Sequence, residues 1–154
     1  MIPVHRLWIG LVFGAVFIGS AVGTDIESYD VALATNREVQ ELTGFTSPSR
    51  NIGCYIEPGY VRCDVRDRAW SPPPKAADCP DYTGWGQGLQ LKTGVGAGFV
   101  CAGDTALDGG PALPYGDEIT AGSIECRSEV SGMSCRDLQD GHEFSISRDG
   151  YQIH

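Results

Sequence analysis

After Gly44, hydrophobic and polar residues form short runs that glycine, proline and other turn residues interrupt. Residues 144–148 alternate apolar and polar side chains, as a half-buried strand does, and Asp149-Gly150 then marks a tight hairpin turn into residues 151–153. The same texture predicts further strands at 51–56, 60–65, 89–92, 98–101, 123–127 and 133–137. About eight short strands separated by turns predict a mainly β fold, a small sandwich or barrel.

The first 23 residues have the composition of a secretory signal peptide. Arg6 precedes an uncharged apolar run over residues 7–19, and small residues follow at positions 21 and 23. This order predicts an apolar N-terminal helix (residues 1–23) that is cleaved after Gly23. An uncleaved anchor is the alternative, because the uncharged stretch before Asp25 is about 18 residues long, just enough to span a bilayer. We therefore expect a secreted protein or one in the extracytoplasmic cell envelope.

Residues 24–43 contain no proline or glycine and show only a weak helical stripe of apolar side chains. An isolated helix this short is marginal in water, so we expect a spacer that is partly helical at best. The disulfide-stapled β domain is then expected to span residues 44–154. Within it, the proline run at 70–76 predicts an extended strap that runs from the first hairpin across the core to Cys79.

All six cysteines follow the predicted signal peptide, and an even number in an exported chain implies a disulfide framework. The first two and the last two are each separated by eight residues that contain a turn signal. Folding each segment as a hairpin places its cysteines directly opposite, with Cα atoms about 4.5–5.5 Å apart, within disulfide reach. The expected disulfides are Cys54–Cys63, Cys126–Cys135 and, from the two cysteines left over, Cys79–Cys101. Zinc sites usually place cysteines closer together in sequence, so we expect no metal.

The charge balance narrows the classes of partner. The chain has 11 basic and 20 acidic residues and a net charge of −9, which becomes −10 when Arg6 is removed with the signal peptide. This balance argues against nucleic-acid binding, which needs lysine and arginine to neutralise phosphates. The expected partner is an envelope or extracellular protein or glycan, and a membrane only if residues 1–23 stay uncleaved.

No residue pattern typical of a catalytic site stands out. The predicted mature chain has only His142 and the terminal His154 as histidines, and it lacks a Gly-x-Ser-x-Gly motif. Acidic residues cluster at 104–110 and 137–143, but neither segment has the spacing of a calcium loop. We therefore expect no catalytic residue, no metal and no cofactor.

Aromatic residues in glycine-rich loops offer a different kind of site. Flat rings beside small residues can form a platform for sugar rings or for a partner's side chains. Tyr82, Trp85 and Tyr115 are the candidate binding residues. The alternative for Trp85, as for Trp70, is that it fills the core of a small β domain.

Several motifs carry a resemblance to a known family, among them Phe45-Thr46-Ser47-Pro48-Ser49, Asn51-Ile52-Gly53-Cys54, Val61-Arg62-Cys63-Asp64 and Leu113-Pro114-Tyr115-Gly116. Over residues 45–154 the chain resembles an exported actinobacterial, mycobacterial-type domain of unknown function with six cysteines. One departure is Arg50, where the resemblance leads us to expect a small residue. The resemblance implies export and disulfides. It implies nothing about activity, because the family it points to has no assigned activity.

These observations predict an exported binding or interaction module without catalytic activity. One alternative is an inhibitor of an extracellular hydrolase, because a loop held rigid between cysteines loses little entropy on binding. Residues 82–88 and 104–115 are the candidate inhibitory loops. A further alternative is a small hydrolase that uses His142 as its base.

Overall fold

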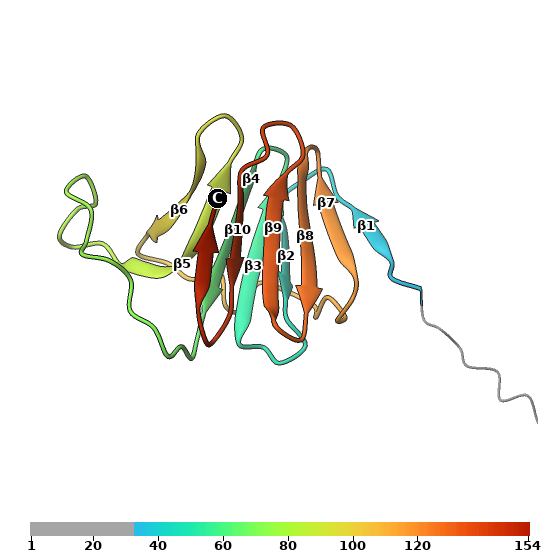
Figure 1. Cartoon of the computed structure of the whole chain (residues 1–154), viewed down its shortest axis with the longest axis horizontal. Helices are drawn as coiled ribbons and strands as arrows, with labels where there is room; N and C mark the ends of the chain where they lie inside the picture. The colour runs from blue at the N-terminus through green and yellow to red at the C-terminus, as the bar shows by residue number, and fades with distance from the viewer. Residues whose placement is uncertain (1–32) are drawn as a thin grey trace, which may run out of the picture. The chain divides into compact units, whose positions relative to one another are not determined.

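The computed structural model describes residues 33–154, which fold into two β-sheets with no helix between them (Figure 1). The six-stranded sheet has the order β1-β7-β8-β9-β10-β11, with β1 (Asn36–Glu38), β7 (Glu118–Ala121), β8 (Ile124–Glu129), β9 (Gly132–Asp137), β10 (Glu143–Ile146) and β11 (Tyr151–Ile153). The five-stranded sheet has the order β2-β3-β4-β5-β6, with β2 (Thr43–Thr46), β3 (Ile52–Glu57), β4 (Tyr60–Val65), β5 (Trp85–Lys92) and β6 (Gly96–Cys101). Among these residues no helix offers the length and apolar character needed to cross a membrane.

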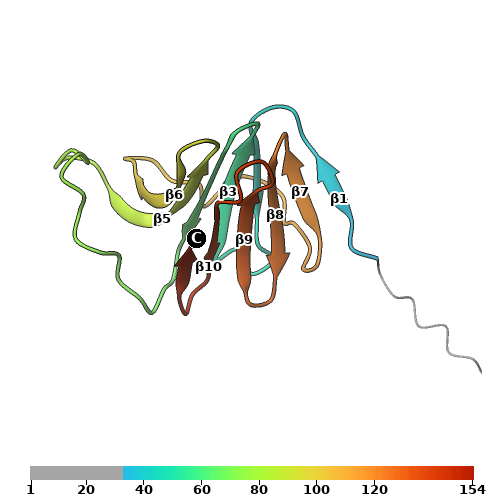
Figure 2. The same ribbon diagram turned by 45° about the horizontal axis from the view of Figure 1, so that its top comes forward.

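The two sheets pack face to face as a sandwich. Figure 2 shows the same two layers with the molecule turned about the horizontal axis. Side chains on β8 and β9 alternate between buried and accessible positions, because successive residues of a strand point to opposite faces. The buried side chains of both sheets form one apolar cluster, in which Phe45, Leu89, Phe144 and Ile146 are at most 1% exposed. This confirms the predicted mainly β fold and shows that it is a sandwich of two sheets, not a barrel.

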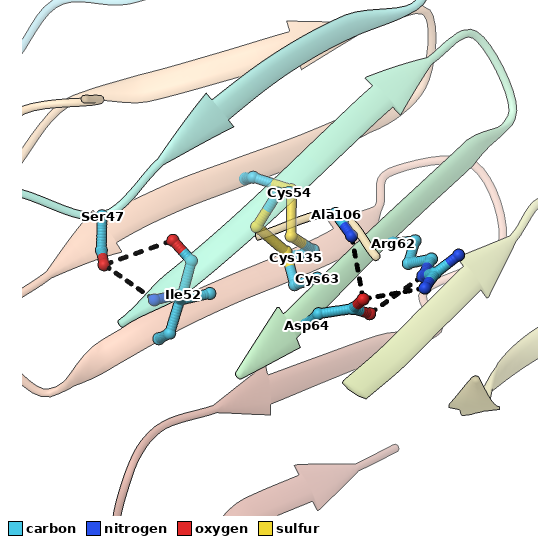
Figure 3. The surroundings of a disulfide bond; sticks show 9 residues. Ser47, Ile52, Cys54, Arg62, Cys63, Asp64, Ala106 and Cys135 are labelled. Atoms are coloured by element: carbon cyan, nitrogen blue, oxygen red, sulfur yellow. Dashed lines mark hydrogen bonds and ion pairs between the residues drawn. A yellow bond between two sulfur atoms is a disulfide. The ribbon is translucent and has the colours of Figure 1, made fainter. Parts of the chain in front are cut away.

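All three expected disulfides are present, with Cα–Cα distances of 4.1 Å for Cys54–Cys63, 5.8 Å for Cys79–Cys101 and 4.1 Å for Cys126–Cys135. The first and third join directly opposed residues of the β3–β4 and β8–β9 hairpins, as the spacing predicts. These hairpins lie in opposite sheets, and Figure 3 shows Cys135 against the Cys54–Cys63 disulfide. The two stapled hairpins therefore meet in the core.

The eight strands expected from sequence are all present, and three more were missed: β1, β2 and β7. β1 corrects the expectation of a spacer over 24–43, because residues 36–38 pair in parallel with β7. β2 begins one residue before the expected domain boundary and pairs with β3. The predicted signal peptide or anchor at 1–23 lies outside the described residues.

The long connection from β6 to β7 is fastened to the five-stranded sheet by a buried ion pair. Arg62 on β4 donates hydrogen bonds of 2.9 and 2.8 Å to Asp64, and these side chains are only 2% and 1% exposed. Arg62 also donates to the Asp104 carboxylate at 2.7 Å and to the Asp104 carbonyl at 2.8 Å. Asp64 in turn accepts a 2.9 Å hydrogen bond from the Ala106 amide (Figure 3). The connection is thereby held at two points, Asp104 and Ala106.

The segment between β4 and β5 packs Trp70 against one side of the sandwich. The Trp70 indole donates a 2.9 Å hydrogen bond to the Ser147 carbonyl, and its ring lies 4.8 Å from that of Tyr151 and 6.5 Å from that of Phe99. Trp70 is partly buried and packs against the core, so the core-filling alternative holds for this residue.

Candidate functional site

One end of the sandwich carries a hollow of about 1170 Å³ whose lining is dominated by arginine. Figure 1 shows the β2–β3, β8–β9 and β10–β11 connections gathered at this end, which is the lower one in that view. The lining residues, which we call the arginine hollow, are Ser49, Arg50, Asn51, Arg66, Asp67, Arg68, Ala69, Tyr115, Val130 and Arg148. Four of these ten residues are arginines in a chain whose net charge is −9.

Hydrogen bonds between the connections fix the backbone of the hollow. The Asn51 side chain donates to the Asp67 carbonyl at 3.0 Å and accepts from the Asp67 amide at 2.9 Å. The Arg66 amide donates to the Asn51 carbonyl at 2.8 Å, and the Ala69 amide donates to the Arg148 carbonyl at 2.8 Å. The segments after β2, β4 and β10 are therefore braced against one another.

Arg50 occupies an unusual backbone conformation at the edge of the hollow. Its amide donates to the Ser47 carbonyl at 2.9 Å in the β2–β3 turn, and its φ is 57°. It is the one residue other than glycine with positive φ among residues 33–154. Such a conformation costs a residue with a Cβ atom about 1 kcal/mol or more, and glycine adopts it freely. The turn thus holds an exposed arginine where its backbone favours glycine.

The arginines of the hollow differ from those elsewhere in their partners. On the outer face of the six-stranded sheet, Arg127 pairs with Glu118, and Arg136 pairs with Glu125 at 2.7 Å. In the hollow, Arg66 has a long 3.4 Å contact with Asp108, and both side chains are at least half exposed. Exposed ion pairs of this kind contribute little to stability.

Arg68 is held by neutral groups instead of a carboxylate. It donates to the Gly86 carbonyl, and its guanidinium lies 4.7 Å from the centre of the Trp70 ring. Arg50 and Arg148 are exposed and form no ion pair within residues 33–154. The hollow therefore presents guanidinium groups that the described part of the chain leaves largely unneutralised.

Comparison with known families adds one finding. The model of a family of unknown function, DUF6636, matches residues 26–153. The chain belongs to the DUF6636 family. No curated protein and no solved structure matches the sequence. The match agrees with the resemblance to a domain of unknown function, while export and an actinobacterial source stay predictions.

The structure of this DUF6636 chain places the three aromatic candidates in different surroundings. Tyr115 lines the arginine hollow and is 43% exposed. Tyr82 is 93% exposed in the connection before β5. Trp85 is half-buried at the start of β5, where its indole donates a 3.0 Å hydrogen bond to the Pro73 carbonyl and its ring lies 5.9 Å from that of Phe99. Only Tyr115 belongs to the hollow.

His142 lies in the connection between β9 and β10. Its amide donates a 3.0 Å hydrogen bond to Asp140, and its ring lies against Gly96, where an added Cβ would be 3.6 Å from the ring. In residues 33–154 the His142 imidazole makes no hydrogen bond to a serine or a carboxylate. The described residues also contain no group of three histidine, cysteine or acidic side chains placed to hold a metal ion.

Sequence reasoning missed the hollow in this DUF6636 domain. Its arginines lie at positions 50, 66, 68 and 148, and only the short run at 66–68 is a local signal. The other sequence hint was Arg50, which departs from the residue expected by resemblance. Neither shows by itself that the β2–β3 and β10–β11 connections meet.

Proposed function

We propose that this protein is an exported, non-catalytic binding module that acts at the cell envelope or outside the cell, with the arginine hollow as its contact surface. Three intramolecular disulfides are typical of extracytoplasmic proteins, because thiols are kept reduced in the cytosol. This agrees with the signal-peptide pattern of residues 1–23.

The observation that carries the proposal is the combination of charge and rigidity in the hollow. Guanidinium groups stand on backbone that is cross-braced by the Asn51–Asp67 hydrogen bonds and by the Ala69–Arg148 hydrogen bond. A braced backbone loses little conformational entropy on binding, so the ordering cost falls mainly on the exposed arginine side chains. Arg50 and Arg148 have no ion-pair partner within residues 33–154, so both guanidinium groups are open to a ligand.

The test is capture from cell-envelope material by the immobilised full chain and by two charge-matched variants. Arg50→Gly with Arg148→Gln removes two charges from the hollow, whereas Arg127→Gln with Arg136→Gln removes two from the outer sheet face. We expect the wild type and the outer-face variant to retain the same component, and the hollow variant to lose it. Equal retention by all three proteins, or retention by none, would contradict the proposal.

A second candidate function, inhibition of an extracellular hydrolase, is favoured by the position of Tyr82. This 93% exposed ring lies three residues after Cys79, whose disulfide to Cys101 ties the loop to the end of β6. We would assay lysozymes and proteases with the full chain and with Tyr82→Ala. Inhibition that Tyr82→Ala abolishes would support this function over the first, and no inhibition by the wild type would remove it.

A further inference from the structure

We infer that the arginine hollow binds an acidic polysaccharide through its carboxylate or phosphate groups. This inference rests on the proposed function, because it assigns a ligand class to the same contact surface. It goes beyond that function by stating which chemistry the hollow recognises.

The hollow holds positive charge that the described residues leave partly without a partner. Arg50 and Arg148 have no carboxylate partner within residues 33–154, although acidic residues outnumber basic ones nearly two to one in the chain. Arginines close together repel one another, and an oxyanion between them removes that repulsion. A guanidinium presents a planar fork of donors that matches the two oxygens of a carboxylate or phosphate. The hollow therefore favours a ligand with several oxyanion groups.

The backbone of Arg50 adopts a conformation that favours glycine. A turn that needs a φ of 57° is filled at no steric cost by glycine, yet the chain places an arginine there with its side chain exposed. The exposed side chain gains no burial in return for this strain. A residue held in an unfavourable conformation without a packing benefit points to a role in binding.

The size of the hollow and its other lining residues favour a sugar polymer as the ligand. An open hollow of about 1170 Å³ has room for a ligand much larger than one phosphate or carboxylate ion. Tyr115 offers a half-exposed ring on which a sugar can stack, and the exposed Ser49 adds a hydroxyl beside it. These neighbours favour a sugar polymer over a flexible acidic peptide.

Acidic side chains limit the path of the ligand. Asp67 is the one carboxylate in the hollow, and an overlapping groove of about 270 Å³ shares Tyr115 and Arg148 with it and adds Glu129 and Asp149. These carboxylates repel an anion, so the polymer is expected to run over the arginine side. The net charge of −9 likewise disfavours nucleic acid as the ligand, because nucleic acid makes broad contact with basic proteins.

The experiment titrates the full chain with polygalacturonate as the carboxylate probe and phosphomannan as the phosphate probe. Neutral dextran, polyglutamate and single-stranded DNA are the comparison polymers. We expect binding to at least one acidic polysaccharide that weakens as ionic strength rises, because salt screens exposed charges. Equal binding to dextran, or tighter binding to polyglutamate or DNA, would overturn the assignment.

Variants tie the binding to the hollow. Arg50→Gly and Arg148→Gln should each weaken binding about fivefold, the loss expected for one exposed charge contact. Arg127→Gln removes the same charge from the outer sheet face and should leave affinity unchanged. Arg50→Gly relieves the positive φ, so its thermal unfolding temperature should not fall, and weaker binding would not reflect misfolding.

The outcome separates this inference from the proposed function. If envelope material is retained through the hollow but neither acidic polysaccharide binds, the binding module stands and the ligand class is wrong. If an acidic polysaccharide binds and the variant Arg127→Gln loses as much affinity as Arg50→Gly, the site lies elsewhere. If nothing binds in either experiment, both proposals fail.

Discussion

Substitution of Arg62 by methionine should destabilise the domain strongly, because it leaves a buried carboxylate without its counter-ion. The two side chains are 2% and 1% exposed, and Arg62 donates twice to Asp64, at 2.9 and 2.8 Å. In the variant the only neighbour in Figure 3 that still donates to Asp64 is the Ala106 amide, at 2.9 Å. Removing one partner of a buried ion pair costs about 3–5 kcal/mol, a large share of the stability of an ordinary domain.

The same change should loosen the β6–β7 connection at Asp104, which gives a second readout. The hydrogen bond from Arg62 lowers the pKa of the Asp104 carboxyl, and the charge of Arg62 adds to this effect. In Arg62→Met the pKa of Asp104 should therefore rise toward its ordinary value of about 3.9. Because a lowered pKa stabilises the fold fully above the ordinary value, the contribution of Asp104 is complete at neutral pH and is lost as the pH falls through its folded pKa.

Urea unfolding with intact disulfides measures the first effect, and an NMR titration of the Asp104 carboxyl measures the second. Arg127→Met is the matched control, because it breaks an exposed pair with Glu118 and should cost less than about 1 kcal/mol. A loss below about 1 kcal/mol in Arg62→Met, or an unchanged Asp104 titration, would refute the reasoning that this ion pair fastens the connection.

Three other outcomes are expected. Gly53→Ala should lower the free energy of unfolding measured in urea by about 1–3 kcal/mol, because an added Cβ would lie 2.3 Å from the Ala106 carbonyl oxygen in the β6–β7 connection. The hydrogen bonds from Thr35 lower the pKa of Asp117, so the stability lost in Asp117→Asn should be seen near neutral pH and shrink below about pH 4, in urea unfolding at several pH values. Limited reduction followed by alkylation and peptide mapping should open Cys79–Cys101 before the two intra-hairpin disulfides, whose cysteines are at most 1% exposed; a different order would show that exposure does not control reduction.

Local patterns were enough to predict most of the strands and all three disulfides. In the β3–β4 hairpin, the turn around Pro58 and Gly59 fixes the register, and the register alone brings Cys54 opposite Cys63. The missed strands lack such signals. β1 is three exposed polar residues, and only its pairing with the distant β7 makes it a strand. β2 contains Gly44 among four residues and is defined by its pairing with β3.

The candidate site was out of reach of sequence reasoning for a related reason. Net charge sums over the whole chain, so an acidic total conceals a local group of basic side chains. Arg50 and Arg148 are 98 positions apart and come to one end only because the β2–β3 and β10–β11 connections both turn there. Loop composition predicts three aromatic binding residues, and one of them, Tyr115, lines the hollow.

The parallel pairing of β1 with β7 also sets the order in which the fold can be completed. Asn36 pairs with Glu118, and the adjacent Thr35–Asp117 hydrogen bonds span 82 positions, so β1 must remain unpaired until most of the chain has emerged. Hairpins such as β3–β4 close over a few residues and lose far less chain entropy in forming. β1 should therefore dock last and open first, with backbone amides that exchange with solvent before those of the stapled hairpins. Each opening would uncover the edge of β7, an open site for strand pairing with another chain.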